Sequence, residues 1–451
     1  MEFTLEYIAK VCDGKLAENT DAERKVIGFY SDSRNTDDSK LFLALRGERV
    51  DGNSFVAGVV QNGGCAITDR EENLLLDGDI VYVSDVRDAL QNLAKHYRND
   101  PKNPEMFFKP VIGITGSVGK TTTKDMVALA LTAERSVHKT LGNSNSQIGL
   151  PQTILAIPKD IDCAVVELGM SMPGEMIKIA ECARPSFSII TNIGYSHIEN
   201  LGSREAIRDE KLKISAFSGD HSYLILNGDE PLLRDFKYDK REVCFVSFED
   251  STCHCYAKNI AESVDGVSFT AVIYHKEVDV SLNVRGKHFV LNALFALVSA
   301  YFLDVNLESA AKKLSTYQSD GKRQHIYEKD GHTVIDDCYN ASPESMKAAL
   351  SVLKTSSGRR IAVLGDMLEL GDTSIMLHKL VGEYTNDSAD VLVTFGEFAN
   401  YIAESSSVHE KYSFDLNEHE ELKSFLQGFV KNGDTVLYKA SNGIKLGRVI
   451  V

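Results

Sequence analysis

The chain alternates short apolar runs with segments whose apolar residues recur at helical spacing, most clearly after about residue 106. A helix is expected at residues 120–134, directly after the apolar run 110–115. Three further apolar runs predict buried strands, at residues 163–169, 187–194 and 222–229. Short apolar runs separated by helices are typical of a mostly parallel sheet. Residues 242–285 then alternate between apolar and polar positions, which predicts an antiparallel patch, and a helix is expected at 289–303.

Strands and helices also alternate on both sides of this central region. Before it, strands are expected at residues 40–47, 65–69 and 80–85, and a helix at 86–100. Two prolines in residues 101–105 predict a linker. After residues 317–324, strands are expected at 332–340, 360–367, 390–397 and 434–441, and a helix at 343–355. A length of 451 residues suggests roughly three domains, so we predict α/β domains at 1–105, 106–318 and 319–451.

The composition mainly argues against several classes of protein. Hydrophobic residues make up 43% of the chain and charged residues 25%, as in ordinary globular proteins. The net charge of −16 argues against general binding of nucleic acid or anionic membranes. The N-terminus lacks a signal-peptide pattern, and no stretch approaches the ~18 apolar residues of a membrane span. Eight scattered cysteines favour a reducing compartment, so we expect a cytoplasmic protein without membrane insertion.

The stretch VIGITGSVGKTTTKD at residues 111–125 joins a predicted strand to a predicted helix, as a phosphate-binding loop does. Gly116 and Gly119 allow a tight turn whose N–H groups face an anion, and the helix start adds partial positive charge. Lys120 would reach the β- and γ-phosphates of a nucleotide, and the Thr121 hydroxyl would bind magnesium. The alternative is a glycine turn before an amphipathic helix. The spacing is unusual, because five residues rather than the usual four separate Gly113 from Gly119.

Two further polar residues follow predicted strands of the central region. Glu167 ends the run CAVVELG, and His197 lies just beyond the run FSIITNIG. In open α/β sheets ligands bind beyond the C-terminal strand ends, so both residues are expected to converge with Lys120 on one crevice. An acid and an imidazole there could bind or orient a divalent metal. Taken singly, Glu167 could instead cap a helix and His197 could be an ordinary loop residue.

The segments GITGSVGKTTTKDM and KTLGNSNSQIGLP, within residues 113–151, resemble those of the Mur ligases of cell-wall peptide synthesis. The short loop form of that family, TG-x-x-GKT(T/S), fits TGSVGKTT. Matching segments continue in the expected order from SDSR at 31–34 to GDMLELG and the nearby His378. The pair DDCYNASP and GDMLELG is the most specific part. It resembles the member that joins D-alanyl-D-alanine to UDP-N-acetylmuramoyl-tripeptide (UDP-MurNAc-tripeptide).

The resemblance implies a three-domain α/β architecture, with a central P-loop, parallel-sheet domain that binds ATP and a C-terminal Rossmann-like domain. It implies ATP-dependent ligation of D-Ala-D-Ala to UDP-MurNAc-tripeptide through an acyl phosphate, with Mg²⁺ as cofactor, by a monomer. One rival is another ligase of the superfamily, such as a folylpolyglutamate synthetase, against which DDCYNASP and GDMLELG argue. The other is a regulatory protein that has lost catalysis, which would be expected to lack Lys120, Glu167, His197 or Lys211.

The resemblance also implies binding residues. The ATP phosphates would be held by a continuous loop: Thr115, Gly116, Ser117, Val118, Gly119, Lys120, Thr121 and Thr122. Asn292 would contact the adenine, and the C-terminal domain would complete the nucleotide site with Arg323, Asp337 and Asn340. The first domain would bind the UDP part with Ser33, Arg34, Asp51 and Gly52. Asn143 and Asn145 would face the same substrate nearer the reacting centre, although turn chemistry is the alternative for all six substrate residues.

For catalysis the resemblance implies Lys120, His197 and Lys211, and for metal binding Thr121, Glu167, His197 and Lys211. An ammonium group has no lone pair and cannot bind a metal. Lys211 would therefore be carbamylated, as a lysine at this place is in related ligases. The alternative is a solvated helix lysine, and Lys213 is the neighbour that could be confused with it.

Two places depart from the family pattern. Phe289 stands where relatives often carry Asn, and Ala440 and Asn442 replace residues of a common segment near the last strand. Neither change touches the phosphate or metal groups. The role of the last strand is left open.

Overall fold

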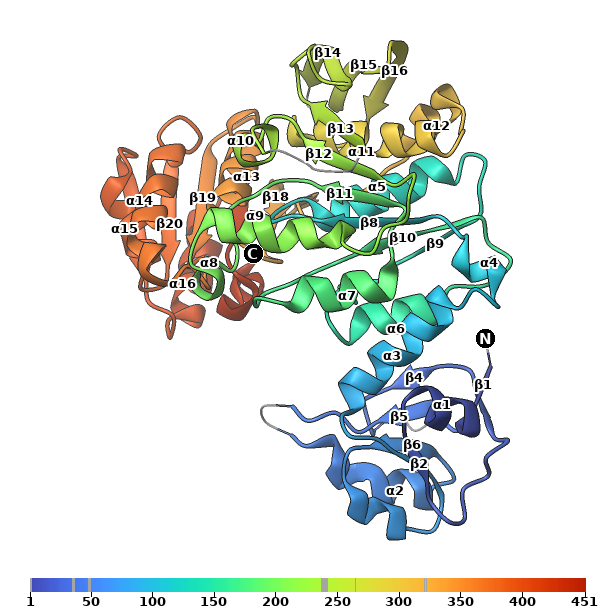
Figure 1. Cartoon of the computed structure of the whole chain (residues 1–451). Helices are drawn as coiled ribbons and strands as arrows, with labels where there is room; N and C mark the ends of the chain where they lie inside the picture. Colours follow the sequence, from blue (N-terminus) through green and yellow to red (C-terminus); the bar gives the residue numbers. More distant parts are fainter. Residues whose placement is uncertain are drawn as a thin grey trace.

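The structure is a computed structural model that describes residues 2–34, 37–47, 50–236, 242–263, 265–319, 321 and 323–451. Three main sheets follow one another along the chain. Figure 1 shows the first, in blue, below the middle one, and the last, in orange and red, beside the middle one. The predicted domain boundaries near residues 105 and 318 fall between the sheets, and they stay our proposal for the boundaries.

The first part of the chain forms a five-stranded sheet in the order β2-β7-β6-β5-β4. Strands β4 to β7 run parallel, and β2 pairs antiparallel with β7. The elements are β1 (Phe3–Thr4), α1 (Leu5–Val11), β2 (Lys15–Leu16), β3 (Lys25–Val26), β4 (Phe29–Tyr30), β5 (Leu41–Leu43), η1 (Gly52–Phe55), α2 (Val56–Gln61), β6 (Cys65–Thr68), η2 (Glu71–Leu75), β7 (Asp79–Tyr82), α3 (Val86–Asn99) and α4 (Pro104–Phe107). Strand β1 pairs antiparallel with β3 in a separate two-stranded sheet.

The middle part forms a nine-stranded sheet in the order β16-β15-β14-β13-β12-β11-β8-β10-β9. Its elements are β8 (Val111–Thr115), α5 (Lys120–Leu131), β9 (Val137–Lys139), α6 (Gly149–Leu155), β10 (Cys163–Glu167), α7 (Glu175–Ala183), β11 (Phe187–Ile190), α8 (Ile198–Leu201), α9 (Arg204–Leu212), η3 (Lys213–Ser215), β12 (Tyr223–Asn227), α10 (Pro231–Arg234), β13 (Glu242–Ser247), β14 (Cys255–Ser263), β15 (Gly266–Ile273), β16 (Lys276–Leu282), α11 (His288–Phe302) and α12 (Leu307–Leu314). The predicted parallel strands are all present.

The antiparallel patch expected at residues 242–285 is partly corrected. Strands β14, β15 and β16 pair antiparallel, as predicted. Strand β13 instead pairs parallel with both β12 and β14, so it continues the parallel sheet. Local alternation cannot show this, because strand direction depends on where the connecting chain crosses and not on which side chains are apolar.

The apolar runs of the middle strands follow from burial on both faces. Along β8, Ile112 and Ile114 pack into one core with residues of α5 and α11, whereas Val111 packs into another with residues of α6 and α7. Alternate residues of a strand point to opposite faces of the sheet. An apolar residue is therefore needed at every position rather than at every second one.

The last part forms a six-stranded sheet in the order β17-β18-β22-β19-β20-β21, parallel except for β17. Its elements are β17 (His325–Lys329), β18 (His332–Asp336), α13 (Pro343–Lys354), β19 (Arg360–Gly365), η4 (Gly371–Thr373), α14 (Ser374–Thr385), β20 (Val391–Phe395), α15 (Ala399–Ser405), β21 (Glu410–Phe414), α16 (His419–Phe429), β22 (Thr435–Lys439), η5 (Asn442–Ile444) and η6 (Leu446–Val449). The C-terminal edge of its strands presents loops toward the middle sheet.

Helix α3 joins the first sheet to the middle one, between the blue body and helices α6 and α7 in Figure 1. Near its C-terminal end, the buried guanidinium of Arg98 donates hydrogen bonds to the carbonyl oxygens of Lys109 and Ala183, at 2.9 and 3.1 Å. The predicted linker at 101–105 overlaps the short helix α4. The connection is therefore packed against the middle sheet rather than extended.

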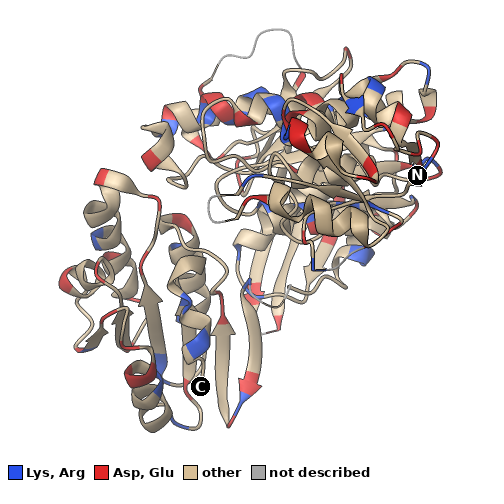
Figure 2. Cartoon of the chain, turned by 90° about the horizontal axis from the view of Figure 1, so that it is seen from below, with Lys and Arg blue, Asp and Glu red and all other residues tan. Residues whose placement is uncertain are grey.

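Charged residues of both signs are interspersed over the three bodies (Figure 2). The overall excess is acidic, with a net charge of −16. None of the helices that the structure describes has the length and apolar content needed to cross a bilayer. A binding site for an anion must therefore concentrate positive charge locally.

Candidate active site

The predicted phosphate loop lies between β8 and α5, and its two glycines are required by its shape. Gly116 has φ 151°, and a Cβ atom there would lie 1.9 Å from Oγ1 of Thr191. Gly119 has φ 83° at the start of α5. Only glycine adopts such conformations without strain. The loop thus turns directly into the helix N-terminus, whose partial positive charge favours an anion.

The loop after β11 holds the phosphate loop in place. Oδ1 of Asn192 accepts hydrogen bonds from the backbone N–H groups of Ser117 and Val118, at 3.0 and 2.8 Å. Oγ of Ser117 accepts one from the Gly194 N–H at 2.8 Å. Sequence reasoning gave no role to Asn192, although it stands in the segment TNIGYSHIENLGS. A carboxamide directly after a buried strand is the signal that was available.

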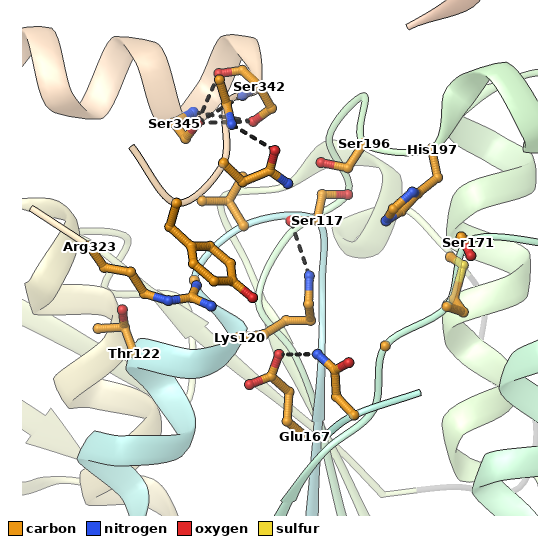
Figure 3. A pocket seen from close by; sticks show the side chains of 18 of the residues that line it. Ser117, Lys120, Thr122, Glu167, Ser171, Ser196, His197, Arg323, Ser342 and Ser345 are labelled. Atoms are coloured by element: carbon orange, nitrogen blue, oxygen red, sulfur yellow. Dashed lines mark hydrogen bonds between the residues drawn. The ribbon is translucent and has the colours of Figure 1, made fainter. Parts of the chain in front are cut away.

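Lys120 is folded back over the loop that precedes it, as Figure 3 shows. Its Nζ donates hydrogen bonds to the carbonyl oxygens of Gly116 at 2.8 Å and Ser117 at 3.2 Å. Desolvation lowers the pKa of its amine; the charge of Glu167 opposes this, and that of Arg323 adds to it. The cation is therefore placed where the phosphates of a bound nucleotide would lie.

Glu167 closes β10 and is the centre of a small hydrogen-bonded cluster. It is 1% exposed. One carboxylate oxygen accepts a hydrogen bond from Oγ1 of Thr121 and the other from Nδ2 of Asn145, both at 2.7 Å. Thr121 follows β8, Glu167 ends β10 and Asn145 follows β9. These strands are parallel neighbours, so the three residues lie together at one edge of the sheet.

The oxygen atoms of Thr121 and Glu167 suit a hard cation such as Mg²⁺. Within the described parts of the chain, no group of three His, Cys, Asp or Glu side chains could hold a metal ion by itself. Magnesium commonly keeps several waters and is bound by one or two carboxylates together with substrate phosphates. The residues therefore fit a magnesium ion that enters with a nucleotide, rather than one enclosed by protein ligands.

His197 and Lys211 occupy different depths of the site. His197 lines the cleft, and its Nδ1 lies 2.5 Å from Oε2 of Glu369, a residue of the C-terminal part. Lys211, in α9, is 2% exposed, and its amine has no hydrogen-bond or ion-pair partner among the residues that the structure describes. Desolvation lowers its pKa well below the ordinary lysine value, and the charge of Lys120 lowers it further. Lys213 instead pairs with Glu210, with Nζ 2.5 Å from Oε2.

The C-terminal part supplies the facing wall. The guanidinium of Arg323 lies 3.7 Å from the ring centre of Tyr339. Oδ2 of Asp337 lies 2.6 Å from Nζ of Lys439, which is 1% exposed and also donates to the Asn340 carbonyl oxygen at 2.9 Å. Desolvation raises the pKa of Asp337, although Lys439 opposes it. Lys439 was missed, but a lysine that ends the apolar run TVLYK was a usable signal.

These groups enclose one cleft of about 540 Å³ between the middle and C-terminal parts. Of the predicted residues, those that line it are Ser117, Val118, Gly119, Lys120, Thr122, Asn145, Glu167, His197, Asn292, Arg323, Asp337 and Asn340. The predicted residues of the middle part that do not line it are Thr115, Gly116, Thr121, Asn143 and Lys211. Asn143 is exposed, and Thr121 and Lys211 are buried behind the wall of the cleft. Arg87, at the start of α3, also lines the cleft and was not predicted.

The four residues predicted to bind UDP lie outside this cleft, at the C-terminal edge of the first sheet. Ser33 and Arg34 follow β4, and Arg34 pairs with Asp32, with Nη2 2.7 Å from Oδ2. Asp51 and Gly52 follow the neighbouring strand β5, and Asp51 accepts a hydrogen bond from Arg70 at 2.6 Å. The structure thus brings the two pairs to one edge, apart from the phosphate loop.

Comparison with known proteins agrees with this geometry. Residues 114–300 match the model of the Mur ligase middle domain, and residues 322–442 match that of the Mur ligase glutamate ligase domain. The UDP-N-acetylmuramoyl-tripeptide–D-alanyl-D-alanine ligase of Bacillus subtilis is 38% identical over 458 residues, which cover 99% of this chain and 97% of that protein. The chain belongs to the Mur ligase family.

Solved structures support the same assignment over the whole length of this Mur ligase. A crystal structure of MurF from Acinetobacter baumannii has a TM-score of 0.88 and 29% identity, and the match covers 100% of this chain and 98% of that one. MurF ligase from Thermotoga maritima, solved in complex with ADP, has a TM-score of 0.82 and 29% identity, covering 94% and 96%. The predicted family and the three-part α/β fold are confirmed.

The departures from the family pattern can be placed in this Mur ligase. Phe289 is buried in the first turn of α11 and lines the cleft. One turn later, Oδ1 of Asn292 accepts a hydrogen bond from Oγ1 of Thr123 at 3.0 Å, beside Gly119. Ala440 is buried in the core of the C-terminal sheet, and Asn442 begins η5. Phe289 is thus at the cleft, whereas Ala440 and the exposed Asn442 do not line it, and none of the three replaces a charged group of the cleft.

Proposed function

We propose that this Mur ligase joins D-alanyl-D-alanine to UDP-MurNAc-tripeptide and cleaves ATP to ADP and phosphate. The observation that carries the proposal is a single cleft in which the phosphate loop, with Lys120, faces Arg323 and Asp337 of another domain. The Bacillus subtilis relative named for this reaction aligns with 99% of the chain.

ATP would bind with its phosphates over the loop from Thr115 to Thr122 and its adenine beside Asn292. Lys120 would place its charge against the β- and γ-phosphates, where negative charge moves during phosphoryl transfer. Arg323, which lies across the pocket from His197 in Figure 3, would approach the nucleotide from the C-terminal domain. The Thermotoga maritima structure named above contains ADP, which supports nucleotide binding by this fold.

Thr121, Glu167 and His197 would hold Mg²⁺, which, when bound, neutralises charge on the transferring phosphoryl group. Thr121 and Glu167 contribute oxygen atoms that already lie 2.7 Å apart. Lys211 would contribute through a carbamate. In that reaction its neutral amine attacks carbon dioxide, a C–N bond forms, and one proton is released. Burial supports this step, because it favours the neutral amine that must act as the nucleophile.

The acyl substrate would bridge two domains. Its UDP end would lie at the edge of the first sheet, near Ser33, Arg34, Asp51 and Gly52, and its peptide would extend toward Asn145. Arg87 stands along this route, at the start of the helix that links the two sheets. Its guanidinium has no ion-pair partner in the part of the chain that the structure describes. It is suited to a free carboxylate of the tripeptide.

The reaction would proceed in two steps. A carboxylate oxygen of the tripeptide attacks the γ-phosphorus, the bond to ADP breaks, and an acyl phosphate forms. The amine of D-Ala-D-Ala then attacks the acyl carbon, phosphate leaves with the former carboxylate oxygen, and the amine loses a proton. Enclosure between two domains protects the acyl phosphate from water. We also propose that the protein acts as a cytoplasmic monomer.

The test is phosphate release from ATP and Mg²⁺ with each substrate alone and with both together. We expect release only when UDP-MurNAc-tripeptide and D-Ala-D-Ala are both present, with a pentapeptide product identified by mass. Controls contain D-alanine or L-amino acids in place of the dipeptide. Release with a single amino acid would move the chain to another branch of the family. A folded protein that binds ATP without substrate-dependent release would contradict the proposal.

A further inference from the structure

A carboxylate of the C-terminal domain contacts the imidazole of His197, for which we propose a role in Mg²⁺ binding. Glu369 lies between β19 and η4, and its Oε2 is 2.5 Å from Nδ1 of His197. The backbone contact continues beside this pair, where the Glu199 N–H donates to the Glu369 carbonyl oxygen at 3.4 Å. Gly371 packs against Glu199 as well. The two domains therefore touch at the imidazole itself.

The loop that carries Glu369 is fixed residue by residue. The Met367 N–H donates to Nε2 of the buried His378, and the Leu368 N–H donates to Oγ of Ser441, both at 2.9 Å. Glu369 itself has φ 64°, a conformation that is costly for a residue with a Cβ atom. Such strain persists only where the surroundings fix it. The backbone position from which this carboxylate reaches His197 is thus fixed within the C-terminal domain.

The nitrogen that Glu369 contacts determines what the imidazole can do. A neutral imidazole that donates its Nδ1 proton to a carboxylate keeps a lone pair on Nε2. Carboxylates paired in this way orient metal-binding histidines and make them more basic. Because His197 lines the cleft, its free nitrogen is available to a cation bound there.

We infer that Glu369 is a positioning residue, which holds His197 in the tautomer whose Nε2 binds a divalent cation once the domains close. The inference rests on the proposed function, because it takes Mg²⁺ as the partner of His197. Its consequence is a metal site that is complete only when the C-terminal domain is in place. ATP would then not be activated before the domain that closes over the amine substrate has arrived.

A second carboxylate at the same interface provides a matched control. Oε1 of Glu344, in the first turn of α13, accepts a hydrogen bond from the Tyr195 N–H at 3.2 Å. This contact also joins the C-terminal domain to the loop that carries His197, but it does not touch the imidazole. Loss of Glu344 removes one hydrogen bond between the domains and should leave the contact between Glu369 and His197 in place.

The experiment measures Mn²⁺ affinity by electron paramagnetic resonance, with the full chain and a non-hydrolysable ATP analogue. The variants are Glu369→Gln, Glu344→Gln, His197→Ala and Asp372→Asn; the last changes a carboxylate a few residues from Glu369 for which no side-chain partner is found among the described residues. Small-angle scattering on the same samples reports domain closure, and thermal melts report folding.

We expect Glu369→Gln to weaken Mn²⁺ binding by about 10- to 100-fold, as loss of such a partner typically does. Glu344→Gln and Asp372→Asn should bind Mn²⁺ like the parent protein. Equal losses in Glu369→Gln and Glu344→Gln would overturn the inference, because the interface as a whole would then be responsible. Unchanged affinity in Glu369→Gln would also overturn it. If His197→Ala left the affinity unchanged, the metal assignment under the proposed function would be the part that fails.

Discussion

At the scale of single residues, we expect Lys120 to contribute strongly to catalysis and little to the stability of the fold. Within the described residues, its Nζ donates only to backbone carbonyl oxygens of its own loop. We predict that Lys120→Ala lowers kcat by about 100-fold or more, as loss of a transition-state charge partner does, while the melting temperature changes little. The exposed Lys102 offers a control, and Lys102→Ala should keep full activity. Substantial ligation by a folded Lys120→Ala protein would refute the phosphate-loop assignment.

Lys211 gives a prediction with a pH dependence. Its pKa is lowered by desolvation and then by the charge of Lys120, so its amine becomes neutral at a lower pH than an ordinary lysine. Carbamate formation needs the neutral amine and should therefore increase as the pH rises through that lowered pKa, and disappear below it. We expect a carbamate resonance with ¹³C-bicarbonate in the parent protein and in Lys213→Arg. The same resonance in Lys211→Arg would contradict the assignment.

Arg87 tests the path of the acyl substrate. Replacing it by Gln removes a charged hydrogen-bond donor, and we predict that KM for UDP-MurNAc-tripeptide rises by about 10-fold, with KM for ATP unchanged. Steady-state kinetics measure both, with Lys102→Gln as the control. The loss should vanish with a tripeptide whose non-reacting carboxylates are amidated. A loss of equal size with the amidated substrate would show that Arg87 does not bind a carboxylate.

At the scale of elements, the turn from β8 into α5 tolerates no Cβ atom at its first glycine. We predict that Gly116→Ala destabilises the protein by roughly 1–3 kcal/mol and abolishes tight ATP binding, because the methyl group meets Thr191. Gly428, in α16, has open space around it, and Gly428→Ala should stabilise by about 0.5–1 kcal/mol. Urea unfolding and binding of a fluorescent ATP analogue measure both effects. Normal ATP affinity in Gly116→Ala would contradict the loop geometry.

The elements also show what a sequence can and cannot predict. Strands β8, β10 and β11 were predictable because burial on both faces demands continuous apolar runs. The residues at their ends followed, since parallel strands bring Lys120, Glu167 and His197 to one edge. The direction of β13 was not predictable, because it depends on the path of the connecting chain.

Contacts between distant parts of the chain could not be predicted from the sequence pattern either. Glu369 stood in a segment singled out by resemblance, yet its contact with His197 spans two domains and depends on how they pack. The same holds for Arg87, which reaches the cleft only because α3 packs against the middle sheet. Lys439 pairs with Asp337 across neighbouring strands of a sheet whose order no local pattern reveals.

At the scale of the whole molecule, three bodies divide the work. We propose that the first binds the nucleotide part of the acyl substrate at a separate edge. The middle one holds the phosphate loop, and the last lines the cleft with Arg323 and Asp337 and contacts His197 through Glu369. Enclosing ATP, an acyl group and an amine in one space is the main source of acceleration expected for such a reaction. We therefore expect turnover to require all three bodies.

The central claim is that this closed cleft makes an acyl phosphate from ATP and the tripeptide carboxylate. The most direct measurement starts from UDP-MurNAc-tripeptide with ¹⁸O at both oxygens of the reacting carboxylate, together with ATP, Mg²⁺ and D-Ala-D-Ala. The account predicts pentapeptide together with inorganic phosphate that carries one ¹⁸O atom from the carboxylate. Phosphate without the label, formed together with the pentapeptide, would contradict it, because the carboxylate would then have been activated without attacking the γ-phosphorus.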